Sequence, residues 1–371
     1  MTFEEARAAF PVLERVAYLN AGTNGPLARA TVEAMVAQSL LDLAAGRSGA
    51  EYVAAVRGRR ERVRAKVAAL IGVPAERVAL TASTTNGCNT VLLGLGLEPE
   101  DEVVTTDEEH FGLLGALHAS GARIRVAGTR GLAPPAALER LLAAVTPKTR
   151  LLALSHVSWV TGNVLPVAEL KAQTGLPTLV DGAQAAGAIP VAAAPYDYYT
   201  VSGQKWPCGP DGVGALYVRE PDSLRVAAPS YLSQQAHRPD GSFDPRPGAS
   251  RFDHALGAAQ LAGFEAALDA VPEWRFQRAR EMAARCRALL SEHVDVATAT
   301  GQSTLVSFRP RGEPAEVVRR LQAQGVVVRE IPGSGLVRVS CGYWTSDGDL
   351  ARLLDGLRAG RPSRRRSYGR D

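Results

Sequence analysis

Short apolar runs alternate with longer stretches of helical periodicity through the first two thirds of the chain. Each run is bounded by Gly, Pro or polar positions and lacks internal polar alternation, which is typical of strands buried on both faces. The predicted strands are 77–81, 102–106, 123–126, 150–155, 178–181, 198–201 and 213–218. Helical patterns separate the early strands, so we expect a mainly parallel sheet covered by helices.

Helical patterns also precede and follow this alternation. The predicted helices are 27–45, 50–70, 87–95, 256–271, 273–293, 314–323 and 347–357. Pro26 suits the first position of the helix that follows it, and Thr2 with Glu5 predicts a capping box that opens a short helix. The segment 230–250 is rich in Pro, Gly, Ser and Gln without periodicity, which predicts a long functional or interface loop.

These elements combine into an α/β fold with two domains. We expect residues 16–270 to form a large domain with a mostly parallel sheet flanked by helices. Residues 1–15 and 271–360 are expected to form a smaller α+β domain, with predicted strands at 304–308, 326–329 and 336–340.

Composition is that of an ordinary globular enzyme, with 46% hydrophobic and 22% charged residues in 371. The net charge is +4, and the tail 361–371 alone carries five arginines and one aspartate. The body is therefore formally neutral, which favours a disordered basic tail over a nucleic-acid-binding face.

The four cysteines are scattered without Cys-x-x-Cys spacing, so neither a disulfide framework nor a zinc site is expected. This pattern favours the reducing cytoplasm. A metal site built from Asp107, Glu108 and His110 is a poor alternative, because the chain has no second ligand cluster. The chain has no apolar run of membrane-spanning length and no apolar signal core, so we expect no membrane association.

Residues able to do chemistry follow two of the predicted strands. Asp181 and Gln184 follow one strand, and Ser202 and Lys205 follow another. Ligands of open α/β sheets bind beyond the carboxyl ends of the strands, so Asp181 and Lys205 are expected to face one crevice. A lysine that forms a Schiff base and an aspartate beside a pyridinium nitrogen are what pyridoxal phosphate requires.

A longer motif around these residues resembles that of a known family. Asp-Gly-Ala-Gln, followed by Ser-Gly-x-Lys-Trp-x-x-Gly-Pro-x-Gly-x-Gly-x-Leu-Tyr, resembles the class V aminotransferase and cysteine desulfurase-like family of fold-type-I enzymes. The likeness extends from Tyr18 to Arg338. It implies pyridoxal 5'-phosphate as cofactor, a small amino-acid substrate, and a homodimer with the active site near its interface.

The resemblance also assigns cofactor contacts. Ser83, Thr84 and Thr85 stand between a strand and a helix, where free backbone N–H groups bind anions, and the family holds the cofactor phosphate there. Ser202 and Gln204 match further phosphate contacts, although the family usually has His in place of Gln204. The remaining implied contacts are His110 stacked on the pyridine ring and Gln184 at the ring oxygen.

Substrate contacts follow from the same resemblance. Arg338 matches the arginine that holds the substrate carboxylate, a role that suits a planar guanidinium. Arg329 is a weaker second candidate, and Asn20 is expected to line the pocket. Trp159 stands where the family often has Asn, and would add an apolar wall. His156, nearby, is most simply a core residue.

Two departures from the family limit the function. Cysteine desulfurases carry a nucleophilic Cys between the positions of Arg329 and Arg338, and residues 330–337 contain none. The segment 251–256 resembles the family's Arg-Phe-Glu segment but lacks the Thr that reaches the neighbouring subunit's phosphate. Cysteine desulfuration is therefore disfavoured, and that contact between subunits is in doubt.

The resulting hypothesis is an enzyme in which Lys205 forms the Schiff base, removes the Cα proton and generates a quinonoid, with Asp181 and His110 as the other catalytic groups. Transamination and β-elimination of a C–S bond are equally supported, and epimerisation less so. A nucleotide-binding dehydrogenase is disfavoured because 209–214 has the wrong glycine spacing and leads into a strand. A non-catalytic binding protein that kept the fold is the other alternative.

Overall fold

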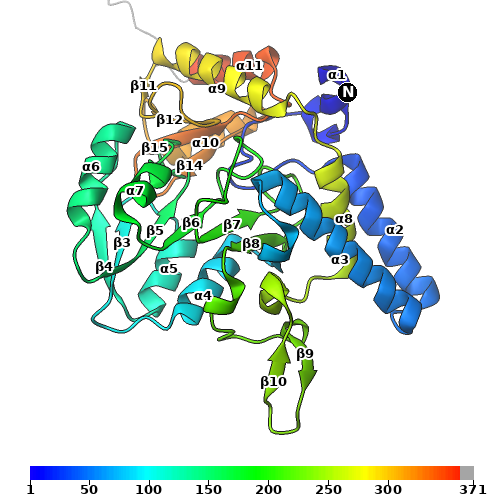
Figure 1. The fold of residues 1–371 in the computed structure, drawn as a ribbon. Helices are drawn as coiled ribbons and strands as arrows, with labels where there is room; N and C mark the ends of the chain where they lie inside the picture. Colours follow the sequence, from blue (N-terminus) through cyan, green and yellow to red (C-terminus); the bar gives the residue numbers. More distant parts are fainter. Residues whose placement is uncertain (360–371) are drawn as a thin grey trace, which may run out of the picture.

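The computed structural model describes residues 1–359, and a seven-stranded sheet forms its centre (Figure 1). The strand order is β2 (Val78–Thr81), β8 (Gly214–Val218), β7 (Tyr198–Ser202), β6 (Thr178–Asp181), β5 (Thr149–Ser155), β3 (Glu102–Thr106) and β4 (Arg123–Ala127). Neighbouring strands from β7 to β4 are parallel, whereas β8 is antiparallel to both of its neighbours. The predicted mostly parallel sheet is confirmed.

Helices cover both faces of this sheet, which explains the uninterrupted apolar runs. One face packs against α3 (Ala50–Ile71), α6 (Pro134–Ala144), α7 (Val167–Thr174) and α8 (Ala258–Asp269). The other face packs against α4 (Thr84–Leu95) and α5 (Phe111–Ala119). Alternate residues of one strand enter different cores: Leu152 and Leu154 face the first, Leu151 and Ala153 the second.

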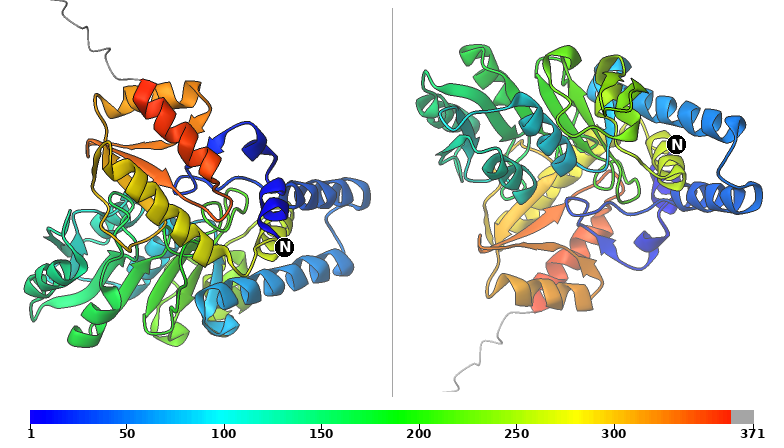
Figure 2. Two further views of the ribbon diagram at one scale, coloured as in Figure 1. Left: turned by 90° about the horizontal axis from the view of Figure 1, so that it is seen from above. Right: turned by 90° about the horizontal axis from the view of Figure 1, so that it is seen from below.

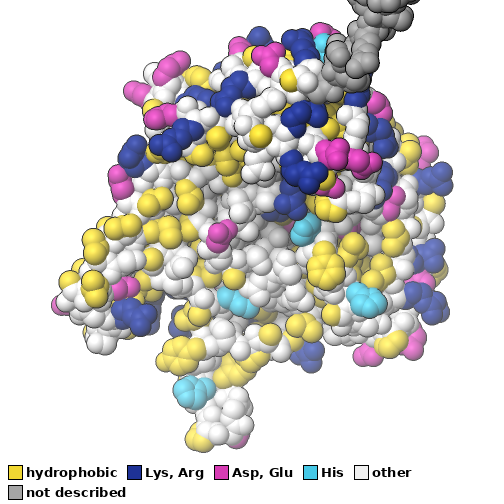
Figure 3. Space-filling model, turned by 180° about the vertical axis from the view of Figure 1, so that it is seen from behind, with side chains coloured by type: hydrophobic (Ala, Val, Ile, Leu, Met, Phe, Trp, Pro, Cys, Tyr) yellow, Lys and Arg dark blue, Asp and Glu magenta, His cyan; other side chains and the backbone are white. Residues whose placement is uncertain are grey.

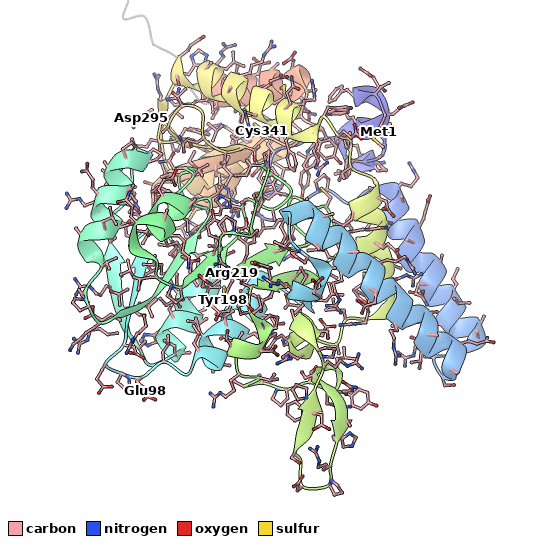
Figure 4. All side chains as sticks on the ribbon, viewed as in Figure 1. Met1, Glu98, Tyr198, Arg219, Asp295 and Cys341 are labelled. Carbon is pink, nitrogen blue, oxygen red and sulfur yellow. The ribbon has the colours of Figure 1, made fainter. Side chains whose placement is uncertain are left out.

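A second sheet lies above the first in Figure 1. It is antiparallel, in the order β11 (Asp295–Val296), β12 (Leu305–Arg309), β15 (Leu336–Ser340) and β14 (Arg329–Ile331). Its core includes side chains of α9 (Arg275–Ser291), α10 (Pro314–Ala323) and α11 (Asp347–Ala359). Cys341 lies in this core below α9, whereas Tyr198 lies lower, on the large sheet (Figure 4).

The N-terminal segment packs on the small sheet's side of the molecule. Helix α1 (Phe3–Ala8) begins with the predicted capping box, and Phe10 then packs against Trp344 with ring centroids 5.4 Å apart. Arg7 forms an ion pair of 2.7 Å with Asp349 at the start of α11. Strand β1 (Ala17–Tyr18) pairs with β13 (Val326–Val327), which holds the following turn between the two sheets. The predicted domain boundaries are consistent with this arrangement but remain a prediction.

Helices α2 (Arg29–Ala45) and α3 form an arm that projects from the body, with α8 packed against them (Figure 2). Several large apolar side chains of α2 are exposed, namely Val32, Val36, Leu40, Leu41 and Leu43. Seen from behind, hydrophobic side chains gather along this arm (Figure 3). The exposed apolar face has no partner within the described part of the chain.

A buried carboxylate fixes the arm to the large sheet. Asp253 accepts hydrogen bonds from Arg60 and Arg64 of α3 and from the backbone N–H of Leu80 in β2, at 2.8–3.0 Å. Both arginines and the aspartate are almost fully buried. The segment 251–256, expected near the neighbouring subunit, therefore has an intrachain role at Asp253.

Three predictions of local structure were wrong. Helix α2 begins at Arg29, so Pro26 lies in the preceding turn rather than at the first helical position. The expected loop 230–250 contains a hairpin, β9 (Gln234–His237) and β10 (Phe243–Pro245), whose polar strands protrude without a buried face to give periodicity. The expected strand 326–329 is two strands, because β13 pairs with β1 and β14 with β15. The predicted tail 361–371 lies outside the described residues.

Candidate active site

Asp181 and Lys205 meet at the carboxyl edge of the large sheet, as predicted. Asp181 ends β6 and is buried, and its Oδ1 accepts hydrogen bonds from the Ala183 N–H and, at 3.4 Å, the Thr200 hydroxyl. Lys205 follows β7, and burial, the largest cause, lowers the pKa of its amine to about 8. The Asp181 carboxylate opposes this shift, while the charges of Arg338 and Arg329 add to it.

A glycine-containing turn after β1 passes over Lys205. The Gly25 N–H donates to the Gln204 carbonyl at 2.8 Å, and a Cβ on Gly25 would lie 2.1 Å from the Lys205 carbonyl oxygen. A Cβ on Gly22 would lie 2.7 Å from Arg338 Nη2. Only glycine allows this approach, so Gly22 and Gly25 belong to the site although sequence reasoning did not single them out.

Gln184 is held by this turn rather than left free to rotate. Its Nε2 donates to the Gly22 carbonyl at 2.8 Å, and its Oε1 accepts from Trp206 Nε1 at 3.0 Å. The second N–H of the amide has no protein acceptor in the described chain. The predicted role of Gln184 at the cofactor ring oxygen therefore depends on that single remaining N–H.

The predicted phosphate-binding residues come together at the start of α4. Ser83 is the N-cap of α4 and its hydroxyl accepts from the Asn86 N–H, while the N–H groups of Thr84 and Thr85 have no described acceptor. Gly214 pairs with Thr81 on one side and Ser202 on the other, which brings Ser202 beside α4. The Ser202 hydroxyl donates to Gln204 Oε1 at 2.9 Å.

His110 is fixed by the helix that it begins. It is the N-cap of α5, and its Nδ1 accepts from the Gly112 N–H at 3.0 Å. The neutral imidazole therefore carries its proton on Nε2. Desolvation, followed by the charge of Lys205, lowers the pKa of His110, which favours the neutral ring. Trp159 lies edge-on to this ring, with centroids 5.1 Å apart.

The predicted substrate residues line the opposite wall. Arg338 is 1% exposed, donates to the Trp159 carbonyl through Nη1 at 2.8 Å, and has a buried Nε without a partner. Arg329 lies directly across from it in β14 and is exposed. Asn20 and Arg329 line a cavity of about 350 Å³ together with Val318 and Gln322 of α10, and neither Lys205 nor Arg338 lines it. Trp159 packs against Ile331 and Leu336, and its role as an apolar wall of the substrate pocket remains a prediction.

Two neighbouring polar residues have structural partners. His156 bonds to the Tyr199 hydroxyl at 2.9 Å, and burial lowers the pKa of the imidazole to about 4, which confirms a core residue. Glu109, which the sequence did not single out, accepts from the Ser155 and Thr106 hydroxyls beneath the site. Burial raises the pKa of Glu109 to about 7. Its only sequence signal was its place beside His110.

The residues present fit pyridoxal phosphate. The N–H groups at the start of α4 are free to bind a phosphate, and Asp181 Oδ2 is free to face a pyridinium nitrogen. The Lys205 amine has no hydrogen bond within the described chain and is desolvated, which keeps it available for a carbonyl group. A mostly parallel sheet that presents lysine and aspartate at one edge is the arrangement of fold-type-I pyridoxal-phosphate enzymes.

Comparison with known proteins gives the family. The model of the Aminotransferase class-V family matches residues 17–353, so the chain belongs to that family, whose members use pyridoxal phosphate. Isopenicillin N epimerase from Streptomyces clavuligerus is 29% identical, over 96% of this chain and 98% of that protein. The enzyme of the same name from Amycolatopsis lactamdurans is 30% identical, over 92% and 94% respectively.

Solved structures agree with the fold. The cystine C-S lyase C-DES, in complex with cysteine persulfide described as its reaction product, superposes with a TM-score of 0.85. It is 30% identical and the alignment covers 94% of this chain and 98% of that one. A lysine-to-alanine variant of C-DES with glycine covalently linked to the PLP cofactor gives a TM-score of 0.86. Among the described helices of the present chain, none is both long and apolar enough to cross a membrane.

Proposed function

We propose that this protein is a β-eliminating C–S lyase that acts on a cysteine-derived amino acid. The net reaction converts a cysteine S-conjugate or cystine, with one water, into pyruvate, ammonia and the released thiol or persulfide. No oxidant or reductant is needed, because the C–S electron pair leaves with sulfur. The support is the similarity to the C-S lyase structure together with the donors around the crevice.

Lys205 is the proposed base in this reaction. Since the pKa of its amine is about 8, an appreciable fraction is unprotonated near neutral pH and can accept the Cα proton. Bound pyridoxal phosphate supplies an electron sink for the bond that loses its proton. Asp181 would hold the pyridinium nitrogen protonated, and Thr84, Thr85 and Ser202 would hold the phosphate.

Arg338 is proposed to hold the substrate carboxylate. Its Nη1 is already used by the Trp159 carbonyl, so Nε and Nη2 remain as a parallel pair of donors. This edge of the guanidinium matches the two oxygens of a carboxylate. Burial makes the contact strong, because water does not compete for the buried Nε.

The observation that carries the lyase proposal is the tautomer of His110. Because Nδ1 accepts from Gly112, Nε2–H is a donor that can stabilise a departing sulfur anion. The four cysteines are all buried. Burial raises the pKa of Cys208, and the hydrogen bond with Cys286, followed by burial, raises the pKa of Cys341, so none suits a protein-bound persulfide.

An epimerase is the second candidate. It is favoured by the two isopenicillin N epimerases, which align over nearly their whole length. In that case an acid on the second face would have to return the proton there, and His110 Nε2–H is a candidate for it. Transamination, which the family name suggests, is the third outcome that an experiment must separate.

The test starts from the visible spectrum of the purified protein with added pyridoxal phosphate. Borohydride treatment and peptide mass spectrometry should find the cofactor covalently attached to Lys205, and the Lys205→Ala variant should bind none covalently. The enzyme is then incubated with L-cystine and S-substituted L-cysteines in deuterium oxide. Pyruvate and thiol released in equal amounts support the lyase.

Other products would overturn the lyase proposal in distinct ways. A keto acid that keeps its β-substituent, with the cofactor in its amine form, indicates transamination. Recovery of the D-amino acid labelled at Cα indicates an epimerase. Absence of any spectral change with cofactor would leave only the shared fold.

We further propose a cytoplasmic homodimer. The exposed apolar side chains of α2, Val36 and Leu40 among them, form a surface suited to a second copy. Light scattering should give twice the 39.2 kDa of one chain. Leu40→Glu should shift the protein to monomers, and no shift would exclude this surface.

A further inference from the structure

A second buried carboxylate, that of Glu109, lies near Asp181 beneath the site. Glu109 is 5% exposed and precedes His110 in the turn between β3 and α5. Its Oε1 accepts hydrogen bonds from the Thr106 hydroxyl at 2.7 Å and from the Ser155 N–H at 3.1 Å. Its Oε2 accepts from the same N–H at 3.0 Å and from the Ser155 hydroxyl. The side chain is therefore held in place, with donors directed at both of its oxygens.

Strand register places this carboxylate on the same face as Asp181. Ser155 and Asp181 end β5 and β6 and are direct partners in that parallel pair, so their side chains point to one face of the sheet. Cys88 of α4 lies near both carboxylates: burial is the largest cause that raises the pKa of its thiol, and the charges of Asp181 and Glu109 follow. Asp181 and Cys88 are the titratable groups that face Glu109, since its contacts on β3 and β5, Thr106 and Ser155, are neutral.

No cation of the protein pairs with this cluster. In the part of the chain that the structure describes, no Lys, Arg or His nitrogen lies within 4.0 Å of either carboxylate. Burial, the largest cause, raises the pKa of Glu109 to about 7; hydrogen bonds from Ser155 and Thr106 oppose this shift, and the charge of Asp181 adds to it. A positive charge beside Asp181 would favour the ionised form of Glu109. The cluster therefore suits a cationic group that a ligand brings.

We propose that Glu109 supplies a second negative charge to the cofactor site and acts with Asp181 to keep the ring nitrogen of pyridoxal phosphate protonated. This inference rests on the proposed role of Asp181 at that nitrogen, and it applies to a lyase, an epimerase and a transaminase alike. Because Ser155 and Thr106 occupy both oxygens of Glu109, its carboxylate acts through its charge rather than by contact with the ring. Glu109 is thus a positioning residue, and the low polarity of the buried cluster strengthens its effect.

Glu109 has one competing role, which is purely structural. In that role its bonds to Ser155 and Thr106 only fix the turn that carries His110. A structural role affects every ring that binds in the site, whatever the atoms of the ring. An electrostatic role affects only a ring that has a nitrogen to protonate.

The test compares pyridoxal phosphate with 1-deazapyridoxal phosphate, in which a carbon atom replaces the ring nitrogen. Dissociation constants from the cofactor-free protein are measured by fluorescence titration at pH 8, above the pKa of about 7 of Glu109. The preference for the ring with nitrogen, expressed as the ratio of the two constants, should fall about tenfold in Glu109→Gln, the equivalent of one pKa unit. Glu109→Asp keeps the charge and should keep most of the preference.

Glu108→Gln is the matched control. Glu108 is the neighbouring residue and is also buried, but its charged neighbours are Asp107 and Arg130 rather than Asp181. The same change from carboxylate to amide should therefore preserve the ratio of the two constants. A tenfold fall in this control as well would overturn a specific role of Glu109.

Each other result has a definite meaning. An unchanged ratio in Glu109→Gln overturns the electrostatic role, even if the affinity for both rings falls. If Asp181→Asn lowers the ratio in that case, the role of Glu109 alone is wrong; if it does not, the proposed place of Asp181 at the ring nitrogen is wrong as well.

Infrared difference spectra of the wild type give a measurement that needs no variant. At pH 7 the carboxyl of Glu109 is about half protonated in the cofactor-free protein. Binding of pyridoxal phosphate should ionise it and reduce the absorption of protonated carboxyl groups, whereas the deaza analogue should not. An equal response to both compounds, or no response to either, would overturn the proposal.

Discussion

The buried amine of Lys205 should destabilise the cofactor-free protein. Replacing it with an uncharged side chain should therefore raise the free energy of unfolding. Lys205→Met keeps a chain of similar length but removes the charge. The Lys205 amine makes no hydrogen bond within the described chain, so the substitution breaks no bond. We therefore expect the variant to be more stable than the wild type at pH 7, although the proposed function requires the lysine.

The magnitude follows from the lowered pKa. The difference between the ordinary 10.5 and about 8 corresponds to about 3 kcal/mol at roughly 1.36 kcal/mol per pKa unit. Because the Lys205 residue as a whole is only half-buried although its amine is desolvated, solvent screening reduces this figure and we expect a gain of roughly 1–3 kcal/mol. Between pH 8 and 10.5 the unfolded chain binds more protons than the folded one, so wild-type stability rises with pH across this window. The variant's advantage is complete below pH 8 and should shrink above it.

Urea unfolding of the two cofactor-free proteins at pH 7 and pH 10.5 measures this difference. Lys66→Met is the matched control, because Lys66 is paired at the surface with Asp269 at 2.5 Å. Loss of that pair should reduce stability by at most about 1 kcal/mol. The reasoning is refuted if Lys205→Met is no more stable than the wild type at pH 7, or if its advantage persists undiminished at pH 10.5.

Four further outcomes are expected. Arg338→Met should raise the KM of any amino-acid substrate by at least about a hundredfold, because a buried bidentate contact is lost, and an unchanged KM would exclude Arg338 as the carboxylate site. Gly25→Ala should destabilise the protein by about 1–3 kcal/mol in thermal unfolding, since its Cβ would lie 2.1 Å from the Lys205 carbonyl oxygen. Gly58→Ala, in an open part of helix α3, should instead stabilise by about 1 kcal/mol. Asp253→Ala should cost about 3–5 kcal/mol, because it removes the buried carboxylate that Arg60 and Arg64 share and leaves Arg64 with only the exposed Glu61, and a cost below 1 kcal/mol would contradict that role.

Much of the catalytic edge could be predicted from local pattern. The runs that became β6 and β7 are apolar throughout because helices cover both faces of the sheet. Parallel strands end at a common edge, so Asp181 and Lys205 had to approach each other. Ser83 was predictable as a cap, because its hydroxyl satisfies an N–H of its own helix.

The strand predictions were wrong where a strand pairs with a segment remote in the sequence, or where it has no buried face. The run 326–329 reads as one strand, but β1 pairs with its first part and β15 pairs with Arg329–Ile331. The hairpin of β9 and β10 has no buried face, so its sequence shows no alternation. An apolar periodicity indicates which face of an element is buried, so it cannot indicate a strand that is exposed on both faces.

By itself, the sequence determined the two-layer arrangement of helices on the large sheet and the placement of lysine and aspartate at its edge, because both follow from burial and strand direction. Only the tertiary structure decided that Gly22 and Gly25 lie against Arg338 and Lys205, and that Arg329 stands opposite Arg338. These contacts join segments far apart in the chain. Their geometry depends on how the two sheets pack, which no local pattern of residues encodes.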